Sequence, residues 1–300
     1  MGDVICANNL AKSYGSLRAV DDVSFSVRSG EFFGILGPNG AGKTTTLEIL
    51  EGLRAADAGE ATLLGTPSWP RNQSLLRRIG VQLQASSFFE RLTAREQIRT
   101  FAALYDVPAS TADEWLGRVG LEDKADSRTD KLSGGQKQRL SIACSLVHDP
   151  ELVFLDEPTG SLDPQARRNL WDLLSSLNDN GRTVVLTTHH MEEAEALCDR
   201  VAIMDHGKIL ELDSPAALVR GLDAPVRMSV ARDAITASEA AAIEGVDEVE
   251  ELPDAVRLST RSPATVLTAL ARRQALDGLQ VQGATLEDVF LTLTGREYRA

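Results

Sequence analysis

The sequence predicts an α/β fold with a mixed sheet and a helical subdomain, followed by a small α+β domain. Uniformly apolar segments such as Phe32–Leu36 are typical of parallel strands that are buried on both faces. Residues from about 86 to 147 instead carry apolar side chains at helical spacing, including Ile98, Phe101 and Leu104. With 300 residues, 43% of them hydrophobic, the chain is long enough for one large domain and a smaller second one.

The first part of the chain contains strands of two kinds and then a helix. Val23, Phe25 and Val27 alternate with two serines, and this period of two predicts a half-exposed antiparallel strand. The buried strand Phe32–Leu36 follows, and a helix is expected over Thr45–Leu53. A glycine-rich segment therefore connects a buried strand to a helix.

This connecting segment matches the phosphate-binding pattern GxxxxGK[ST], filled by Gly37, Gly42, Lys43 and Thr44. The glycines let backbone N–H groups point at phosphate oxygens, the lysine reaches the β and γ phosphates, and the threonine hydroxyl sits on Mg²⁺. The helix N-terminus adds free N–H donors and the favourable end of its dipole. The alternative is a glycine-rich turn that matches by chance, and the flanking strand and helix argue against it. The residues expected to contact the nucleotide are Gly37, Pro38, Asn39, Gly40, Ala41, Gly42, Lys43, Thr44 and Thr45.

A second buried strand, Leu152–Leu155, ends abruptly in Asp156 and Glu157. Two adjacent carboxylates at the end of a buried strand are unfavourable unless they share a cation or a proton. We therefore expect Asp156 to be the Mg²⁺ partner and Glu157 to orient and deprotonate an attacking water. A solvated acidic turn before Pro158 is the alternative, and it fits poorly beside a phosphate-binding loop.

The segment Leu132–Gln136, with the sequence LSGGQ, predicts a second anion site. Ser133 is a typical N-cap for a helix that runs to Val147 and ends before Pro150. Small residues at a helix start let the phosphate of another molecule approach the backbone. With this motif the chain resembles an ATP-binding-cassette (ABC) ATPase, in which LSGGQ is the signature motif. The resemblance assigns ATP contacts to Ser133, Gly134, Gly135 and Gln136.

The same resemblance implies roles for two residues that precede the signature motif. Tyr14 resembles the aromatic residue that stacks on adenine, although a half-buried strand residue is the alternative. Gln84, which closes IGVQLQ, resembles the Q-loop glutamine that touches Mg²⁺ and senses the membrane partner. Gln82 is the less favoured candidate, because the family residue ends the strand and does not lie within it.

The resemblance also covers two segments after the carboxylates. Ser161–Asp163 resembles the D-loop, which crosses the dimer interface and includes Asp163 among the nucleotide-site residues. His189, at the end of an apolar strand, resembles the switch histidine that contacts the γ-phosphate. The neighbouring His190 is excluded by register, because the family motif continues after one variable residue as Met191–Ala194.

In the family, the signature motif of one cassette closes on the ATP held by another. This chain carries one set of motifs, and all of them are intact. The resemblance therefore implies a second cassette as partner, with a homodimer that contains two competent sites.

Composition limits the other functional classes. No apolar stretch approaches the ~18 residues needed to span a bilayer, and Met1–Leu10 lacks the features of a signal peptide, so we expect a chain that is neither secreted nor itself the channel. Cys6, Cys144 and Cys198 are far apart and form no CxxC pair, which indicates free thiols in a reducing cytosol. The net charge of -13 opposes a nucleic-acid role.

The pattern changes near residue 221, which predicts a cassette over residues 1–221 and a second domain over 222–300. The cassette ends with a hairpin, Val201–Leu212, and a helix that begins after Asp213. The second domain is expected to be α+β and ferredoxin-like. Its predicted strands are Val226–Val230, Val246–Leu252, Ala255–Ser259 and Leu279–Gln282, and its predicted helices are Ala237–Ala242 and Pro263–Ala271.

A last helix is predicted between Thr285 and Gly295, with Thr285 and Asp288 forming a start of the capping-box type. The sequence TLEDVFLTLTGRE resembles the C-terminal extension of stand-alone exporter ATPases of the daunorubicin-resistance type. Its apolar face either packs within its own domain or contacts a partner, and both alternatives stay open.

Together these features predict the separate ATP-hydrolysing subunit of an ABC transporter, most consistent with ABC-2 type export of a drug, antibiotic or other small or lipophilic compound. Its expected location is the cytoplasm, peripheral at the inner face of the membrane through a separate permease. The alternatives are a soluble ABC ATPase that acts on nucleic acid or ribosomes, and an ATP-binding regulator without turnover, which Glu157 disfavours. The segment Ala85–Thr93 contains Phe88, Phe89 and Leu92, and it is the predicted docking surface for the permease.

Overall fold

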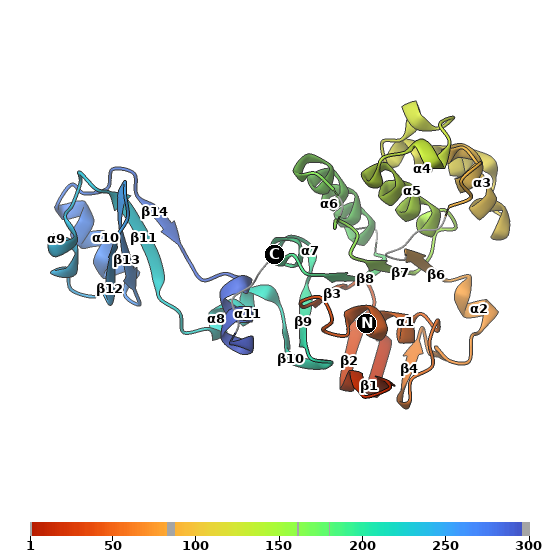
Figure 1. Ribbon diagram of the computed structural model, residues 1–300, viewed down its shortest axis with the longest axis horizontal. Helices are drawn as coiled ribbons and strands as arrows, with labels where there is room; N and C mark the ends of the chain where they lie inside the picture. Colours follow the sequence, from red (N-terminus) through yellow and green to blue (C-terminus); the bar gives the residue numbers. More distant parts are fainter. Residues whose placement is uncertain (1, 83–87, 161, 180, 296–300) are drawn as a thin grey trace. The chain divides into compact units, whose positions relative to one another are not determined.

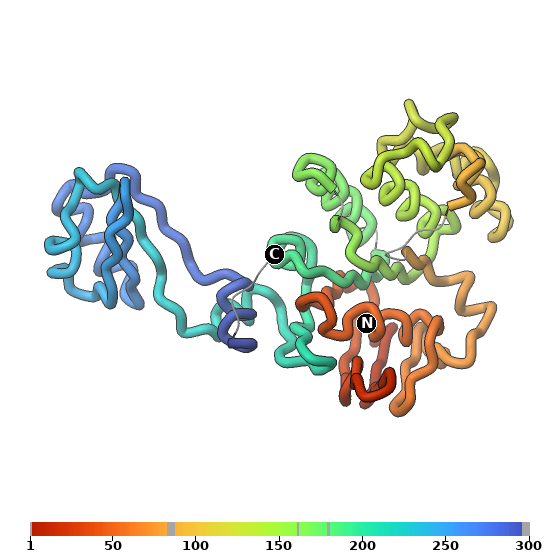
Figure 2. The backbone as a smooth tube through the Cα atoms, viewed as in Figure 1, coloured from red at the N-terminus to blue at the C-terminus, as the bar shows by residue number. Residues whose placement is uncertain are grey.

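The computed structural model describes residues 2–82, 88–160, 162–179 and 181–295, and the chain divides into two compact units (Figure 1). The first unit is Met1–Pro215 and the second is Ala216–Ala300. The helix α8 (Pro215–Gly221), placed at the end of the cassette from sequence, groups almost entirely with the second unit. The backbone trace in Figure 2 allows the chain to be followed through each unit.

A six-stranded sheet forms the centre of the first unit, in the order β10-β9-β3-β8-β7-β6. All neighbouring strands are parallel except β9 and β10, which form the predicted hairpin. Because the strands from β6 to β9 run in one direction, their carboxyl ends meet at one edge of the sheet. The strands are β3 (Phe32–Leu36), β6 (Ile79–Gln82), β7 (Leu152–Asp156), β8 (Thr183–Thr188), β9 (Arg200–Asp205) and β10 (Lys208–Asp213).

A four-stranded antiparallel sheet in the order β2-β1-β4-β5 belongs to the same unit. Its strands are β1 (Asp3–Tyr14), β2 (Leu17–Arg28), β4 (Ala58–Leu63) and β5 (Thr66–Pro67). Val23, Phe25 and Val27 of β2 are buried, as their alternation predicted. The rings of Phe25 and Phe33 stack with centroids 5.1 Å apart, so the antiparallel sheet is packed against β3.

The helix α1 (Lys43–Leu50) follows the glycine-rich loop and starts two residues before the predicted Thr45. The other helices near the sheet are α2 (Gln73–Leu76), α6 (Pro164–Asp179) and α7 (Met191–Leu197). Leu47 and Leu50 of α1 are buried in the core that both sheets share. Packing of α1 under the loop therefore fixes the position of the loop.

Over residues 88–147, the described part of the predicted helical region, there are three α-helices and two short 3₁₀ turns. They are α3 (Ala94–Leu104), α4 (Ala109–Arg118), α5 (Gly134–Leu146), η1 (Glu122–Lys124) and η2 (Thr129–Lys131). Ile98, Phe101 and Leu104 lie on α3, as their spacing predicted; Ile98 is fully buried, whereas Leu104 is 67% exposed. Leu104 is the last helical residue, and the chain turns away just after it at Asp106, whose φ is 61°.

The second unit has the element order β-α-β-β-α-β, which is that of ferredoxin-like domains. Its elements are β11 (Val226–Ala231), α9 (Ala237–Ala241), β12 (Glu248–Glu251), β13 (Ala255–Thr260), α10 (Pro263–Arg272) and β14 (Gln280–Gln282). The four strands are antiparallel in the order β12-β13-β11-β14. The core of this unit is separate from that of the first and includes Met228, Leu258 and Leu270.

The chain continues into α11 (Leu286–Thr294), which has the predicted capping box of Thr285 and Asp288 and ends at Gly295 in a left-handed conformation with φ 64°. Its apolar residues Leu286, Val289 and Phe290 are buried. Arg227 of β11 pairs with Asp288 at 3.1 Å. In the described part of the chain, every helix is too short or too polar to cross a membrane.

Candidate active site

The glycine-rich loop lies where β3 ends and α1 begins, and two of its glycines are required by close backbone contacts. A Cβ atom on Gly37 would lie 2.2 Å from the carbonyl oxygen of Met204, and one on Gly42 would lie 2.2 Å from that of Ala19. Gly42 also has a φ of 103°, which side chains disfavour. The Gly37 N–H donates to the Thr188 carbonyl at 3.2 Å, which anchors the loop to β8.

Lys43 is held inside this loop with its side chain only 5% exposed. Its ammonium donates to the carbonyl oxygens of Gly37 at 2.8 Å and Pro38 at 3.1 Å, and it lies 3.4 Å from Glu157 Oε1. Burial lowers the pKa of Lys43, and the negative charges of Glu157 and Asp156 oppose that shift. A cation is therefore fixed at the centre of the loop, as a phosphate-binding site requires.

Asp156 ends β7 and contacts two hydroxyl groups from neighbouring segments. Thr44 donates to Asp156 Oδ1 at 3.4 Å, and Thr187 of β8 donates to the same oxygen. Burial raises the pKa of Asp156, and the two hydroxyl donors oppose the shift. A divalent cation would offset the burial of this carboxylate. The hydroxyl of Thr44 and the carboxylate of Asp156 are hard oxygen ligands, so this donor set fits Mg²⁺.

Glu157 lies between Lys43 and His189. Its Oε2 atom is 3.3 Å from His189 Nδ1. The backbone of Glu157 has a positive φ of 48°, and its N–H donates to both the carbonyl and the hydroxyl of Thr187 at 3.1 Å. A non-glycine residue in this conformation is unfavourable, so these bonds to Thr187 stabilise it. The predicted residues Lys43, Asp156, Glu157 and His189 therefore come together at one edge of the sheet.

The neighbouring His190 has a structural position at the start of α7. It is the N-cap residue of α7, and its N–H donates to Thr188 Oγ1 at 3.0 Å. Burial lowers the pKa of His190, and the neighbouring His189 adds to this shift. The contact to Glu157 that is described above is made by His189.

An open pocket of about 390 Å³ lies over the loop. Its lining combines the ends of β1 and β2 with the loop, the start of α1 and Glu157: Tyr14, Leu17, Ala19, Asn39, Gly40, Ala41, Gly42, Lys43, Thr44, Thr45 and Glu157. The Tyr14 side chain is 40% exposed here, and the Arg54 guanidinium lies 5.2 Å from the centre of its ring. Tyr14 is thus both a strand residue and a pocket residue, so its ring is available for stacking with a planar base.

The signature segment starts α5 with a capping box. Ser133 Oγ accepts from the Gln136 N–H at 3.3 Å, and Gln136 Oε1 accepts from the Ser133 N–H at 2.9 Å. Leu132 is buried, whereas Ser133 and Gly134 are exposed. A Cβ atom on Gly134 would meet no other atom within 4 Å. Small, exposed groups at this helix start leave room for a ligand from outside the chain.

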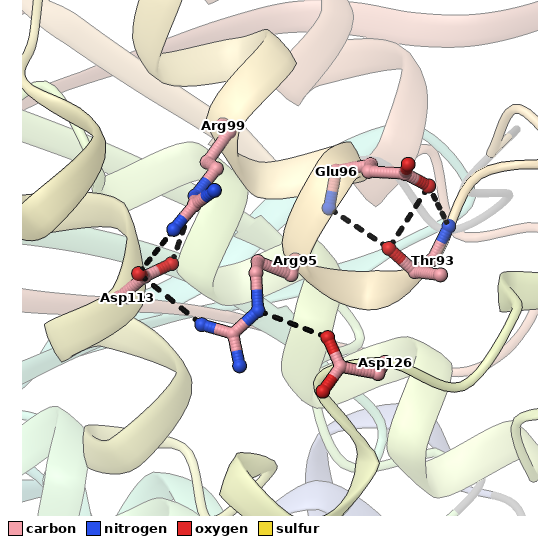
Figure 3. A network of polar contacts seen from close by, with 6 residues as sticks. All are labelled: Thr93, Arg95, Glu96, Arg99, Asp113 and Asp126. Carbon is pink, nitrogen blue, oxygen red and sulfur yellow. Dashed lines mark hydrogen bonds and ion pairs between the residues drawn. The ribbon is translucent and has the colours of Figure 1, made fainter.

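The loop before the signature segment is fastened to α3. Three backbone hydrogen bonds join residues 125–129 to residues 92–95. The N–H groups of Ala94 and Arg95 donate to the carbonyls of Ser127 at 3.0 Å and Ala125 at 2.8 Å, and the Thr129 N–H donates to the Leu92 carbonyl at 2.9 Å. Figure 3 shows the side-chain network beside this ladder, in which Arg95 reaches Asp126 at 3.0 Å and Asp113 at 3.2 Å, and Arg99 also pairs with Asp113. A network of this kind holds the loop more firmly than isolated surface pairs can.

Asp163, expected in the D-loop, has a different role within this chain. Asp163 Oδ1 accepts from the N–H groups of Gln165 at 3.0 Å and Ala166 at 2.9 Å, so within this chain it caps α6. Gln84 and Ser161 lie outside the described residues. Gln82 is buried and is the last residue of β6 as described, opposite Leu155 of β7.

Sequence reasoning did not identify Thr187 or Arg54 as neighbours of the site. The double threonine that closes β8 is the only signal for Thr187, because a hydroxyl at the end of a buried strand needs a partner. Arg54 follows α1 and carries no pattern that connects it with Tyr14, forty residues earlier.

The phosphate-binding loop, the paired carboxylates and the signature helix, on a sheet of this order, define the ATP-binding cassette of ABC transporters. The chain belongs to this family and is an ABC-type ATPase. Residues 20–160 match the family model described as ABC transporter. The chain is 38% identical to the Nod factor export ATP-binding protein I of Ralstonia nicotianae, over 99% of this chain and 95% of the relative. It is 40% identical to the protein of the same name from Sinorhizobium fredii, over 97% of this chain and 86% of the relative.

Solved structures show the same fold. A dimeric bacterial ABC transporter cassette matches with a TM-score of 0.66 and 28% identity, over 70% of this chain and 98% of that one. A dimeric cassette in a post-hydrolysis state, bound to ADP and Pi, matches with a TM-score of 0.65 and 28% identity over the same shares.

Proposed function

We propose that this chain is the ATP-hydrolysing subunit that powers a separate membrane permease in export. The observation that carries the proposal is the extent of its similarity to export ATP-binding proteins, which covers 97–99% of this chain and thus includes the second unit. The solved cassettes cover 70% of the chain, so their likeness supports the ATPase part alone. The exported compound belongs to the class of small or lipophilic molecules.

The hydrolytic roles follow from the geometry of the site. Glu157 is the general base for the attacking water, and His189 orients it through the 3.3 Å contact. Lys43 and the loop hold the β and γ phosphates, and Tyr14 stacks on the adenine. Thr44 and Asp156 would hold Mg²⁺, which would neutralise charge that develops on the phosphates. Gln84 belongs to the same proposal as a further Mg²⁺ contact.

A second copy of the chain completes the site. The described residues that line the pocket include none from the signature segment, although that segment presents exposed small groups at a helix start. We infer a homodimer in which Ser133, Gly134, Gly135 and Gln136 of one copy face the phosphates held by the other, with Asp163 near the interface. The dimeric cassettes among the similar structures support this arrangement.

The permease is proposed to dock at the surface formed by Phe88–Leu92. These residues line an open hollow of about 560 Å³, and the Phe89 ring is 61% exposed. The backbone at this point is fixed, because the Phe89 carbonyl accepts from Thr129 Oγ1 at 3.0 Å and from the Leu92 N–H at 2.9 Å. An apolar ring held at the surface by a rigid backbone suits a groove for a partner helix. The subunit would then lie peripherally at the inner face of the membrane.

The test is to replace Phe88 and Phe89 together with alanine and to measure three quantities. We expect loss of co-purification with detergent-extracted membrane protein and loss of transport, while the ATPase rate of the isolated subunit stays near that of the unchanged chain. Leu104→Ala is the matched control, since Leu104 is a similarly exposed apolar residue in the helical region. Unchanged transport in the double variant would eliminate the docking surface. A joint loss of ATPase and melting temperature would show instead that these rings pack the helical region.

The export proposal has its own test. A tagged chain extracted from membranes in mild detergent should bring down an integral membrane protein with about six apolar spans. Co-purification of RNA or ribosomes, with no membrane protein, would contradict it.

A further inference from the structure

The ring of Tyr14 is contacted by an arginine that the proposed nucleotide site does not use. The Arg54 guanidinium lies over this ring, 5.2 Å from its centre. A guanidinium at this distance is attracted to the electron-rich face of an aromatic ring. Tyr14 lines the pocket over the phosphate-binding loop, whereas Arg54 is not among the described residues of that lining. The guanidinium therefore covers a part of the ring outside the pocket and leaves the pocket side free.

Glu48 fixes the guanidinium in this position. Its Oε2 atom accepts from Arg54 Nε at 2.6 Å. Its backbone carbonyl accepts from the N–H groups of Leu53 at 2.9 Å and Arg54 at 3.1 Å, so the backbone and the side chain of the arginine are bonded to one residue. The side chains of Glu48 and Arg54 are both partly buried. A pair held in this way is more restricted than a fully exposed ion pair.

The segment after Arg54 also holds the strand that carries the tyrosine. The Asp57 carboxylate accepts from Lys12 Nζ at 2.6 Å and from the Ser13 N–H at 2.8 Å. Both donors lie on β1, directly before the tyrosine. The end of β1 is thus fastened to the chain that follows α1, and the arginine of that same segment contacts the ring.

The arrangement connects the tyrosine with the phosphate-binding lysine. Glu48 lies on α1, and the first residue of this helix is Lys43. The helix therefore carries the lysine at its start and the partner of Arg54 near its end. Because a helix is rigid, groups that are attached to it keep a fixed relation to one another. The ring of Tyr14 is thereby positioned relative to the phosphates.

We propose that Arg54 is a positioning residue for recognition of the purine base, which holds the Tyr14 ring in the orientation that stacks on adenine. The inference rests on the stacking role that is proposed above for Tyr14. The described polar and ring contacts of Arg54 are with Glu48 and Tyr14, so it acts through the ring. A ring that is already fixed loses less conformational entropy when the base binds, and this favours binding of the nucleotide.

Steady-state kinetics of the full-length chain should separate base recognition from chemistry. Arg54→Met keeps an unbranched side chain but removes the charge and the bond to Glu48. KM for ATP should rise about 2- to 10-fold, as expected for loss of a cation–π contact at a partly exposed site. The value of kcat should stay nearly unchanged, because this interaction is the same in the ground state and the transition state. Arg54→Lys keeps the charge without the planar fork and should give an intermediate KM.

Two results for KM would overturn the proposal. A KM of Arg54→Met equal to that of the unchanged chain would show that the contact with the ring does not contribute to nucleotide binding. A lower KM would show that the guanidinium competes with the base for the ring.

Inorganic tripolyphosphate distinguishes the base from the phosphates, because it carries phosphates without a base. Its inhibition constant against ATP hydrolysis should be the same in Arg54→Met and in the unchanged chain. Equal losses of affinity for ATP and for tripolyphosphate would show that Arg54 attracts anions through its charge alone, and would overturn the proposal.

Arg78→Met is the matched control. Arg78 Nε donates to Glu151 Oε1 at 2.6 Å, the same distance as between Arg54 and Glu48, and its side chain is also partly exposed. Its replacement removes an equal charge and a similar ion pair, so KM for ATP should equal that of the unchanged chain. A rise in KM as large as that of Arg54→Met would assign the effect to the lost charge, and would overturn the proposal.

Tyr14→Ala tests the stacking role and the positioning role separately. If it raises KM for ATP but not the inhibition constant of tripolyphosphate, stacking is supported, and Arg54→Met should then add little to its effect. If KM of Tyr14→Ala stays unchanged, the stacking role is wrong and the inference fails with it. If Tyr14→Ala raises KM and the effect of Arg54→Met adds to it in full, Tyr14 keeps its role and only the positioning by Arg54 is overturned.

Discussion

The carboxylate of Glu157 lies 3.3 Å from the imidazole of His189, measured from Oε2 to Nδ1. The two residues follow neighbouring parallel strands, β7 and β8, whose carboxyl ends meet at one edge of the sheet. The other oxygen of Glu157 lies 3.4 Å from the Lys43 ammonium, so one carboxylate connects the histidine with the phosphate-binding loop. This arrangement suits a base that is oriented on one side and faces the phosphates on the other.

Replacement of Glu157 by glutamine should separate binding from chemistry. The amide keeps the shape of the side chain but cannot take a proton from water. ATP should still bind, while turnover falls on the order of 100- to 10,000-fold, as expected for loss of a general base. Size-exclusion chromatography with ATP should show a stable dimer, because the complex forms but does not react. Near-normal turnover would place the base elsewhere.

The two adjacent histidines should respond differently to substitution. His189→Ala removes the partner of Glu157 and should abolish most hydrolysis. His190→Ala should have a mild effect, because the N–H of His190 donates to Thr188 Oγ1 from the backbone, and alanine retains that group. Steady-state ATPase assays of both variants give the comparison directly. The opposite order of effects would mean that the switch motif is misaligned by one residue.

The sequence predicted the parts of the site that local rules control. Apolar runs fixed β3, β7 and β8, and polar residues just after such strands must meet at one edge of the sheet. That rule alone brings Lys43, Asp156, Glu157 and His189 together. The N-cap position of Ser133 was also predictable from the sequence, because the capping box that it forms involves four consecutive residues.

Features that depend on tertiary packing were not predictable. Glu193 lies in the acidic segment MEEAEAL, where every glutamate looks solvated, and only the packing of α6 on α7 buries it. Leu104 shows the reverse case, since it is an apolar residue at helical spacing that lies at the end of α3 and is exposed. The role of Thr187 depends on pairing between β7 and β8, which are distant in sequence.

A chain that ends at Asp223 should still bind ATP. The phosphate loop, both carboxylates, the signature segment and the switch histidine all precede this point, and the second unit has its own core. A compact unit with its own core can be removed while the other unit keeps its fold. Titration with a fluorescent ATP analogue should give a similar Kd, and Lys43→Ala in the shortened chain is the negative control. A folded, monodisperse product without affinity would show that the second unit completes the cassette.

Glu51 provides a prediction about stability, because its burial has no compensating contact. The residue follows the end of α1 and is 3% exposed, and neither carboxyl oxygen has a hydrogen-bond partner among the residues that the structure describes. Burial raises the pKa of Glu51 well above its usual range, and the negative charges of Asp156 and Glu48 add to this effect. The C-terminal end of a helix dipole also disfavours an anion there.

The sign of the pH dependence follows from the raised pKa. The folded chain holds the Glu51 proton at a pH where the unfolded chain, with a carboxyl pKa of about 4.3, has released it. The free energy of unfolding therefore decreases as pH rises above the unfolded pKa, by about 1.4 kcal/mol for each unit of pH until the folded pKa is reached. Glu51→Met fills a similar volume without a titratable group, so it should unfold at higher urea concentration than the unchanged chain.

Urea unfolding without nucleotide at pH 5 and pH 8 tests this directly. The stability gain of Glu51→Met should be larger at pH 8. At that pH the unchanged chain must either keep the Glu51 carboxyl protonated or carry a buried negative charge. Glu60→Gln, at an exposed position of β4, is the control and should change stability by no more than about 0.5 kcal/mol at either pH. A gain that is equal at both pH values, or a loss of stability at pH 8, would show that the Glu51 carboxyl finds compensation in the folded chain.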